Sequence, residues 1–340
     1  MINLSNPAIS ILLPFYNTAS TLAQCLDSIL NQTFTNFELL AINNGSTDDS
    51  VAVVVAKMGS DPRLKLLNLE KAGLIPALNL GLQEAKADII ARMDGDDVMH
   101  ATRLEKQIQY LKQNSNCSLV ACKVDLFPKE LIKEGYWEYI RWQNSCITAQ
   151  DIRDEIYWES PLAHPSVTFV KKDVLALGGY RDGAFPEDYD LWLRMNQAGF
   201  IMEKLPETLL DWREGSTRLS RNDPRYNREA FDVIRAEFLS QDSRLKQNRP
   251  LVVWGAGRST RLRAKHLLDK GFKLTAWIDV DNNKIGNKVW GAMVHSPQWL
   301  KQKEKPFVLS YVTVRGAKEK NRQQLEEMGY KRGLDYLMVG

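Results

Sequence analysis

Three aspartates within four positions, Asp94, Asp96 and Asp97, follow a short apolar segment. Carboxylates packed so closely repel one another, so the turn needs a positive partner. Asp94 and Asp96 point the same way in an extended chain, and Gly95 lets the backbone bend around a bound ion. Mg²⁺ or Mn²⁺ fits this arrangement, because such ions take one or two carboxylates together with water and nucleotide phosphates. For these residues alone, a solvated turn or an N-cap for a helix that begins near Arg103 is the alternative.

A second carboxylate that could do chemistry lies at the start of a predicted helix. Asp188 shares a helical face with the apolar Leu191 and Met195. Asp190 precedes Arg194 by four residues, which predicts an ion pair on the surface. Asp188 is therefore the one carboxylate of this segment expected to face inward, either as a general base or as a cap for the helix.

The elements that must position these residues alternate between strand and helix. Such β-α-β units predict an α/β fold with a doubly wound parallel sheet, whose ligands bind at the carboxyl ends of the strands. Three strand ends are polar and are expected to share one cleft, at residues 16–17, 43–44 and 94–97. The expected strands are 9–16, 37–43, 64–69 and 88–94, and the helices between them are expected near 18–30, 51–58 and 73–85.

Four motifs along this part of the chain resemble those of the family 2 glycosyltransferases, inverting enzymes of the GT-A fold whose bacterial members build cell-surface glycans. The resemblance is specific because four motifs keep the family's order and spacing, and it covers about residues 8–240. It implies a GT-A type nucleotide-diphospho-sugar transferase domain of the hexosyltransferase class. The motifs are Pro14-Phe15-Tyr16-Asn17, Asn43-Asn44-Gly45-Ser46-Thr47-Asp48, Ala77-Leu78-Asn79-Leu80-Gly81 and Ala91-Arg92-Met93-Asp94-Gly95-Asp96-Asp97.

The resemblance also implies roles for single residues. Asp94 and Asp96 would hold the metal ion, and Asp188 would be the general base, because a Glu-Asp pair at this distance after the metal motif carries the base in the family. The family usually has aspartates where this chain has Asn43 and Asn44, so an amide would replace a carboxylate in reading the base. A UDP-sugar is the favoured donor. The residues implied to bind it are Pro14, Phe15, Tyr16, Asn43, Arg92 and Asp94.

Two further segments could contact substrates. Residues 128–157 are rich in Tyr and Trp and form either an acceptor platform or an irregular segment packed onto the sheet. Many relatives have a metal-binding histidine near position 215, where this chain has Gly215. Three arginines near that position could instead hold the diphosphate as a mobile flap, or they could be solvated: Arg213, Arg218 and Arg221.

A polar linker at residues 241–249 leads from the first domain, 1–240, to a second predicted domain at 250–340. There a strand enters a turn with Gly255 and Gly257, and Asp279 ends the next strand, a spacing that resembles the dinucleotide-binding fingerprint. Thr260 stands where the third glycine of that fingerprint belongs. We therefore expect a smaller Rossmann-like α/β domain in which Gly255, Gly257 and Asp279 are the candidate ligand residues, and we do not expect NAD binding.

The net charge of +3 hides an uneven division of charge. Residues 1–240 carry a net charge of −8 and residues 241–340 a net charge of +11. Arg258, Arg261 and Lys265 share one face of the helix after the glycine turn. This stripe could attract anionic lipid headgroups, or it could face the acidic first domain. No nucleic acid is expected as a partner, because no aromatic residues interleave the stripe.

Composition indicates where the protein works. Its 340 residues, with 44% apolar and 26% charged, are typical of a globular protein of two domains. No basic stretch precedes the apolar segment 9–15, as a secretory signal would require. The four cysteines show no CxxC spacing, so reduced and mostly buried thiols are expected. The expected location is cytoplasmic, or peripheral to the inner face of the cell membrane.

The sequence thus predicts metal-dependent, inverting transfer of a sugar from a nucleotide-diphosphate sugar to an acceptor hydroxyl. The acceptor would be a glycan or a lipid-linked glycan in surface polysaccharide or glycolipid synthesis. Two alternatives belong to other classes of protein: an NAD-dependent oxidoreductase that uses the C-terminal domain, and a non-catalytic sugar-nucleotide-binding protein.

Overall fold

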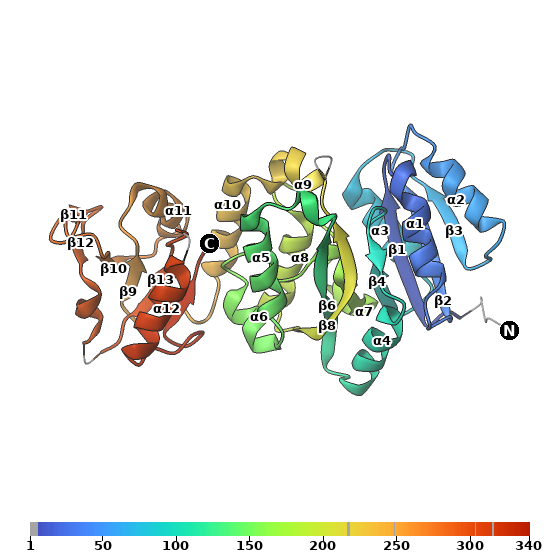
Figure 1. The fold of residues 1–340 in the computed structure, drawn as a ribbon. Coiled ribbons are helices and arrows are strands. Elements are labelled where there is room, and N and C mark those ends of the chain that lie inside the picture. Colours follow the sequence, from blue (N-terminus) through green and yellow to red (C-terminus); the bar gives the residue numbers. More distant parts are fainter. Residues whose placement is uncertain (1–5, 216–217, 248, 303, 315) are drawn as a thin grey trace. The chain divides into compact units, whose positions relative to one another are not determined.

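The computed structural model describes residues 6–215, 218–247, 249–302, 304–314 and 316–340 (Figure 1). Contacts divide the chain into two compact units. Unit 1 comprises Met1–Ala149 and Pro161–Asp223, and unit 2 comprises Gln150–Ser160 and Pro224–Gly340. Residues 150–160 and 224–240 thus group with the C-terminal unit. The predicted division had placed them in the first domain, 1–240. Ion pairs explain part of this grouping, since they join residues 150–160 to later parts of the chain: Arg244 to Asp154 at 3.0 Å and Lys318 to Glu155 at 2.6 Å.

Unit 1 is built on a mixed eight-stranded sheet in the order β3-β2-β1-β4-β7-β6-β8-β5. The strands β3, β2, β1 and β4 are parallel neighbours, which confirms the predicted α/β class. β7 runs antiparallel to both β4 and β6, and β5 runs antiparallel to β8. The strands are β1 Ile9–Phe15, β2 Phe37–Asn43, β3 Leu64–Asn68, β4 Ile89–Arg92, β5 Val98–Met99, β6 Cys117–Phe127, β7 Thr168–Val170 and β8 Ile201–Arg213.

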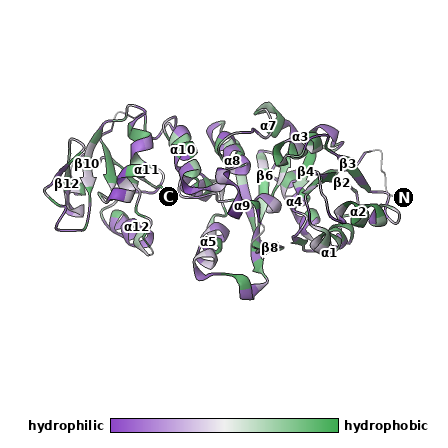
Figure 2. Cartoon of the chain, turned by 90° about the horizontal axis from the view of Figure 1, so that it is seen from above, coloured by the Kyte–Doolittle hydropathy of each residue, from purple (hydrophilic) through white to green (hydrophobic). Residues whose placement is uncertain are grey.

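Burial explains why the central strands are so apolar. Every residue of β1 is buried, because this strand lies between two others and both its faces are covered. In the hydropathy view, the strands β4, β6 and β10 are largely hydrophobic (Figure 2). The register places Phe15 opposite Asn43 and Asn43 opposite Asn68, so the carboxyl ends of β1, β2 and β3 lie level at one edge of the sheet.

Helices connect and cover these strands, and one of them corrects an interpretation of the sequence. Residues 134–145, for which an irregular segment was one of the two interpretations, form the helix α5, on which Tyr136 stacks on Tyr139 with ring centroids 5.7 Å apart. The helices that begin in unit 1 are α1 Ala19–Leu30, α2 Ser50–Met58, α3 Leu74–Glu84, α4 Arg103–Gln113, α5 Glu134–Ser145, α6 Ala149–Glu155, α7 Lys171–Ala176, α8 Glu187–Gln197 and α9 Leu219–Asn222, with 3₁₀ turns at Lys129–Leu131 and His164–Ser166.

The predicted ion pair between Asp190 and Arg194 on α8 is present, but its expected place on the surface was wrong. Asp190 is 0% exposed and pairs with both Arg181 and Arg194. Glu187 is also buried, whereas Asp188 is half-buried, so Asp188 is not the only carboxylate that faces inward. Nearly all residues of α8 are buried, so this helix has no polar face in solvent on which Asp190 could lie.

Unit 2 contains a six-stranded sheet in the order β11-β12-β10-β9-β13-β14. All its pairs are parallel except the hairpin of β11 and β12. Its five parallel strands follow the order 3-2-1-4-5, as in doubly wound sheets with a switch point between the first and fourth strands. The elements are α10 Arg228–Leu239, β9 Leu251–Trp254, α11 Arg258–Leu268, β10 Leu274–Ile278, β11 Lys288–Val289, β12 Ala292–His295, β13 Phe307–Ser310, α12 Ala317–Glu327 and β14 Tyr336–Met338, with 3₁₀ turns at Pro224–Tyr226 and Pro297–Leu300.

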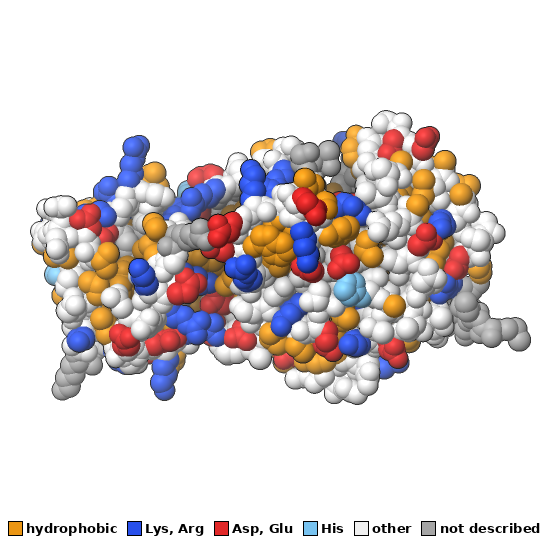
Figure 3. All heavy atoms as spheres, viewed as in Figure 1, with side chains coloured by type: hydrophobic (Ala, Val, Ile, Leu, Met, Phe, Trp, Pro, Cys, Tyr) orange, Lys and Arg blue, Asp and Glu red, His pale blue; other side chains and the backbone are white. Residues whose placement is uncertain are grey.

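The thiols are as the composition predicts, whereas the uneven division of charge is not visible on the face shown in Figure 3. All four cysteines are buried and unbonded, as predicted. Acidic and basic side chains are interspersed on the face shown in Figure 3, which carries no large patch of one sign. None of the helices in the described ranges combines the length and the apolar character that a membrane span needs.

Candidate functional site

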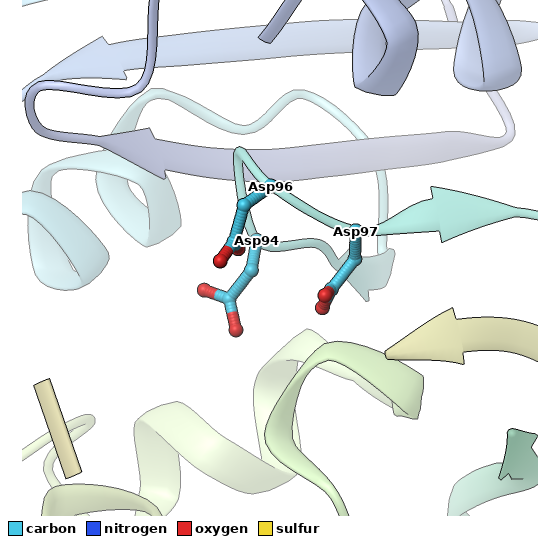
Figure 4. Close-up of side chains that lie close together, drawn as sticks. All are labelled: Asp94, Asp96 and Asp97. Atoms are coloured by element: carbon cyan, nitrogen blue, oxygen red, sulfur yellow. The ribbon is translucent and has the colours of Figure 1, made fainter. Parts of the chain in front are cut away.

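The three aspartates lie together in the turn between β4 and β5, which we call the acidic turn (residues 94–97). Asp94, Asp96 and Asp97 each offer one carboxylate oxygen, and these oxygens all lie within 4.8 Å of one another. The three side chains project to the same side of the turn (Figure 4). The prediction named Asp94 and Asp96 as ligands, and the geometry adds Asp97.

The first connection of the sheet holds the acidic turn in place. A Cβ on Gly95 would lie 3.2 Å from the Thr18 hydroxyl and 3.3 Å from the Cβ of Phe15, so the turn packs closely against the end of β1 and the start of α1. From α1, the Thr21 hydroxyl donates to the Gly95 carbonyl at 3.3 Å and the Cys25 thiol to the Asp94 carbonyl at 3.2 Å. The end of β1 and the start of α1 therefore fix the carboxylates before any ligand binds.

The charge of the acidic turn is only partly balanced. Burial, and next the charge of Asp94, raise the pKa of Asp96 to about 6, and burial and Asp96 raise the pKa of Asp97 well above its usual range. One oxygen of Asp97 accepts the Arg213 backbone N–H at 2.8 Å, whereas the other is buried without a hydrogen-bond partner among the described residues. A hard divalent cation prefers oxygen ligands, so three carboxylates this close, one with a buried oxygen to which no described residue donates, fit Mg²⁺ or Mn²⁺.

Arg92 connects the acidic turn with the start of α8. The buried guanidinium pairs with Asp94, which neutralises one oxygen of the turn. The same positive charge acts on Asp188, whose pKa is nevertheless raised to about 8 by burial and by the charge of Glu187. Asp188 also accepts the backbone N–H of Tyr189 at 2.7 Å, a bond that an amide could keep. The predicted base and one predicted metal ligand thus share a single cation as neighbour.

The sequence did not predict that His164 and Tyr180 lie beside the buried Glu187. His164 Nε2 lies 2.9 Å from the Tyr180 hydroxyl, and His164 Nδ1 lies 3.7 Å from Glu187 Oε1. Burial lowers the pKa of His164 well below its usual value, so the ring is neutral at pH 7. These residues are 16 and 23 positions apart, and no local pattern in the sequence could have joined them.

The predicted nucleotide edge consists of two linked turns. Tyr16 is 55% exposed beside the buried Phe15, so its ring is free to meet a ligand. Asn43 accepts the Ser46 backbone N–H at 2.9 Å and donates to Asn68 at 3.0 Å. Its carbonyl oxygen keeps one lone pair and its amide nitrogen keeps one N–H for a base.

Two of the three predicted flap arginines lie near the acidic turn. Arg213 donates from Nε to the Asp96 carbonyl at 2.6 Å, and its guanidinium lies 4.3 Å from the Phe127 ring centroid. Arg218 lies over Trp212 and donates to the Tyr136 hydroxyl, and its charge lowers the pKa values of Asp96 and Asp97. Arg221 pairs with Glu214. None of the three is a freely solvated side chain.

In unit 2, the Asp279 side chain lies beside the glycine turn and is hydrogen-bonded to it. Asp279 accepts the Ala256 backbone N–H at 2.8 Å and pairs with Lys284 at 3.3 Å. A Cβ on Gly255 would lie 2.8 Å from Thr260, the residue at the place of the third glycine. The carboxylate that would take a ribose is already bonded to the turn.

Comparisons with known proteins connect unit 1 to one family. The family model described as Glycosyl transferase family 2 matches residues 10–177. The amylovoran biosynthesis glycosyltransferase AmsE of Erwinia amylovora is 31% identical over 231 residues, which cover 67% of this chain and 82% of that protein. The O-antigen biosynthesis glycosyltransferase WbnJ of Escherichia coli is 38% identical over 193 residues, covering 55% of this chain and 72% of that protein.

A solved structure supports the fold. The structure of residues 1–349 of S. aureus TarS in complex with UDP-GlcNAc superimposes with a TM-score of 0.53 at 16% identity. The match covers 77% of this chain and 80% of that chain. At this identity the likeness establishes a shared fold only.

Proposed function

The chain belongs to glycosyltransferase family 2 and is a glycosyltransferase, and from this premise we propose that it transfers a sugar from a nucleotide-diphosphate sugar with inversion at the anomeric carbon. The acceptor is a hydroxyl of a growing surface polysaccharide or of a lipid-linked glycan. AmsE and WbnJ are named for the synthesis of bacterial surface polysaccharides, which supports this acceptor class.

One observation carries the proposal. Three carboxylates with ligand oxygens within 4.8 Å of one another stand at the carboxyl end of β4, at the same sheet edge as Phe15 and Asn43. Through Arg92 they are electrostatic neighbours of a second carboxylate, Asp188. A donor bound between these groups would meet a site for its diphosphate and a base for its acceptor.

In the proposed reaction Asp188 takes the proton of the acceptor hydroxyl as that oxygen forms its bond to the anomeric carbon. The bond from the anomeric carbon to the diphosphate oxygen breaks on the opposite face, and the diphosphate leaves with the electron pair. Asp94, Asp96 and Asp97 would hold Mg²⁺ or Mn²⁺, which when bound offsets the negative charge of the diphosphate. Arg218 lies near the same carboxylates and adds a fixed positive charge.

We propose a UDP-sugar as donor. TarS, which shares the fold, holds UDP-GlcNAc. The lone pair left on Asn43 can accept the uracil N–H, and the exposed Tyr16 ring can stack on the base. This amide replaces a charged acceptor, so we expect the chain to bind the base less tightly than a relative with a carboxylate at this position.

A thermal-shift screen of UDP, GDP, dTDP and CDP, each with and without Mn²⁺, tests the proposal. A ligand at 100 times its Kd stabilises the native state by about 2.7 kcal/mol and so raises the unfolding temperature. Among these nucleotides we expect UDP with Mn²⁺ to raise it most. Each nucleotide without metal is the matched control. Absence of any metal-dependent shift would reject the donor site.

NAD(H) in the same screen tests the oxidoreductase alternative, which the bonding of Asp279 to Ala256 disfavours. A shift with NAD(H) alone would favour that alternative. The third alternative, a non-catalytic sugar-nucleotide-binding protein, needs no base. It predicts nucleotide binding without sugar-transfer activity in the wild type, and no change of that binding in Asp188→Asn.

We further propose that unit 2 contacts anionic lipid through the stripe of α11. Arg258 and Lys265 are exposed, and the half-buried Arg261 lies 5.8 Å from the ring centroid of Trp290. Leu262 and Trp290 are 53% and 50% exposed. Cations beside an exposed Trp and Leu suit the headgroup region of a bilayer, where each cation contributes about 1 kcal/mol.

Liposome co-sedimentation measures this contact. We expect binding to phosphatidylglycerol vesicles that is lost at high salt and in the Arg258→Glu, Arg261→Glu, Lys265→Glu triple variant. A control triple variant reverses the exposed Lys273, Lys288 and Lys301, which changes the net charge equally without touching the stripe. Equal binding by the two variants would show that only net charge matters, and no sedimentation at low salt would reject the membrane contact.

A further inference from the structure

Unit 2 contains a buried arginine, Arg263, that forms no ion pair with any carboxylate of the described residues, although the charge of Asp232 acts on it. Arg263 lies on α11 and is 5% exposed. Its Nη2 donates to the Tyr311 carbonyl, but Nε and Nη1 are buried with no acceptor among the described residues. Three of the five N–H groups of this guanidinium therefore lack a partner, in an environment where an unbalanced charge is costly.

The neighbours of Arg263 add positive charge. Arg228, Asp232 and Arg235 recur on α10 at intervals of four and three, so they share one face of that helix. Asp232 is the one carboxylate among them, and it pairs with Arg235 at 2.8 Å. Burial, and next the charge of Arg228, lower the pKa of Arg263 to about 10. Arg235 also donates to an oxygen of Gly340, and Glu159 is a further carboxyl group near Arg228 and Arg235, whose pKa is raised by burial.

This arginine cluster (Arg228, Arg235 and Arg263) adjoins the segment that follows β13. The Tyr311 carbonyl accepts from Arg263, and the Thr313 hydroxyl accepts from Arg228 at 3.1 Å. Val312, between them, would lie 2.9 Å from a Cβ on Gly255 in the turn after β9. The cluster thus stands beside the switch point of the sheet, the usual ligand position in doubly wound folds. Arg228 and Thr313 are exposed, so the cluster reaches the surface.

We infer that the arginine cluster of unit 2 binds an oxyanion, either inorganic phosphate or the phosphate group of a small organic molecule. Such a group accepts several N–H bonds at once and supplies the negative charge that Asp232 alone cannot provide. The ligand differs from a dinucleotide, because Asp279 is bonded to the glycine turn and Thr260 fills the place of the third glycine. None of these residues belongs to the proposed donor site, so the inference does not depend on sugar transfer.

Equilibrium dialysis of the full chain with radiolabelled inorganic phosphate tests the inference, with EDTA present and the ionic strength held constant with chloride. We expect one equivalent of phosphate to bind, and Arg263→Gln to weaken binding by about tenfold or more, the scale of a lost charge-assisted contact. Arg228→Gln, a change at an exposed position, should weaken binding similarly. This variant provides the test if Arg263→Gln, a change at a buried position, folds poorly. Lys265→Gln, on the same helix, should bind like the wild type.

Competition with AMP identifies the source of the oxyanion. Displacement of phosphate by AMP at a much lower concentration than by unlabelled phosphate indicates an organic phosphate, and equal concentrations indicate the free ion. Both results require the cluster. Undiminished binding in the Arg263→Gln and Arg228→Gln variants, or no binding of phosphate or AMP by the wild type, overturns the inference.

Discussion

Replacing Asp188 by Asn should lower kcat by about a hundredfold or more, the scale of a lost general base, while the affinity for the donor stays unchanged. The amide keeps the size of the side chain and can still accept the Tyr189 N–H, but it cannot take a proton. Sugar transfer under single-turnover conditions measures the chemical step, and titration of UDP with Mn²⁺ measures donor affinity. Asp88→Asn, at an exposed position just before β4, is the matched control and should keep full activity.

The pH dependence of kcat/KM is an independent test of Asp188 as the general base. Burial and Glu187 raise the pKa of Asp188 to about 8 in the free protein, so its base form is lost as the pH falls through that value. We expect kcat/KM to fall with decreasing pH below about 8, and the Asp188→Asn variant to lack this limb. Full activity in the variant, or loss of its native fold, would instead support a role in capping α8.

The sequence carried most information where function depends on local spacing. The strand ends and the acidic turn follow from apolar segments of strand length and from residues two apart, so their positions could be predicted to within about two residues. Asp97 was adjacent to the predicted ligands. Strict alternation along an extended chain would point Asp97 away from Asp94 and Asp96, whereas the turn brings one oxygen of each of the three to within 4.8 Å of the others.

The prediction failed where tertiary packing decides. Asp190 looked like half of a surface pair, yet α8 lies in the interior and Asp190 needs two arginines, one of them Arg181 from outside the helix. The contact between His164 and Tyr180 depends on how separate segments pack, which no periodicity encodes. The arginine cluster of unit 2 likewise joins α10, α11 and the segment after β13. Arg228 and Arg235 lie in the part of the chain with a net negative charge, so the uneven division of charge did not indicate this cluster.

Replacing Asp96 by Asn should abolish the metal-dependent binding of the nucleotide. The variant loses one ligating charge, and the diphosphate would then face the remaining carboxylates with less neutralisation. The Mn²⁺-dependent thermal shift with UDP measures this loss, with Asp88→Asn again as control. Equal shifts in the variant and the wild type would show that Asp96 does not hold the ion.

Metal-free stability separates this loss from damage to the fold. Burial and Asp94 raise the pKa of Asp96 from 3.8 to about 6, so the native state binds the proton more tightly than the unfolded chain does. Protonated Asp96 therefore contributes to the free energy of unfolding at pH values below 3.8, its pKa in the unfolded chain. This contribution, at most about 3 kcal/mol, is lost as the pH rises through about 6. Asp96→Asn has no such charge to lose, so at pH 7.5 in EDTA we expect it to unfold at the same temperature as the wild type or a few degrees higher. A variant that is more stable without metal but no longer responds to it has lost a ligand, whereas one that is less stable in both conditions has lost a structural contact.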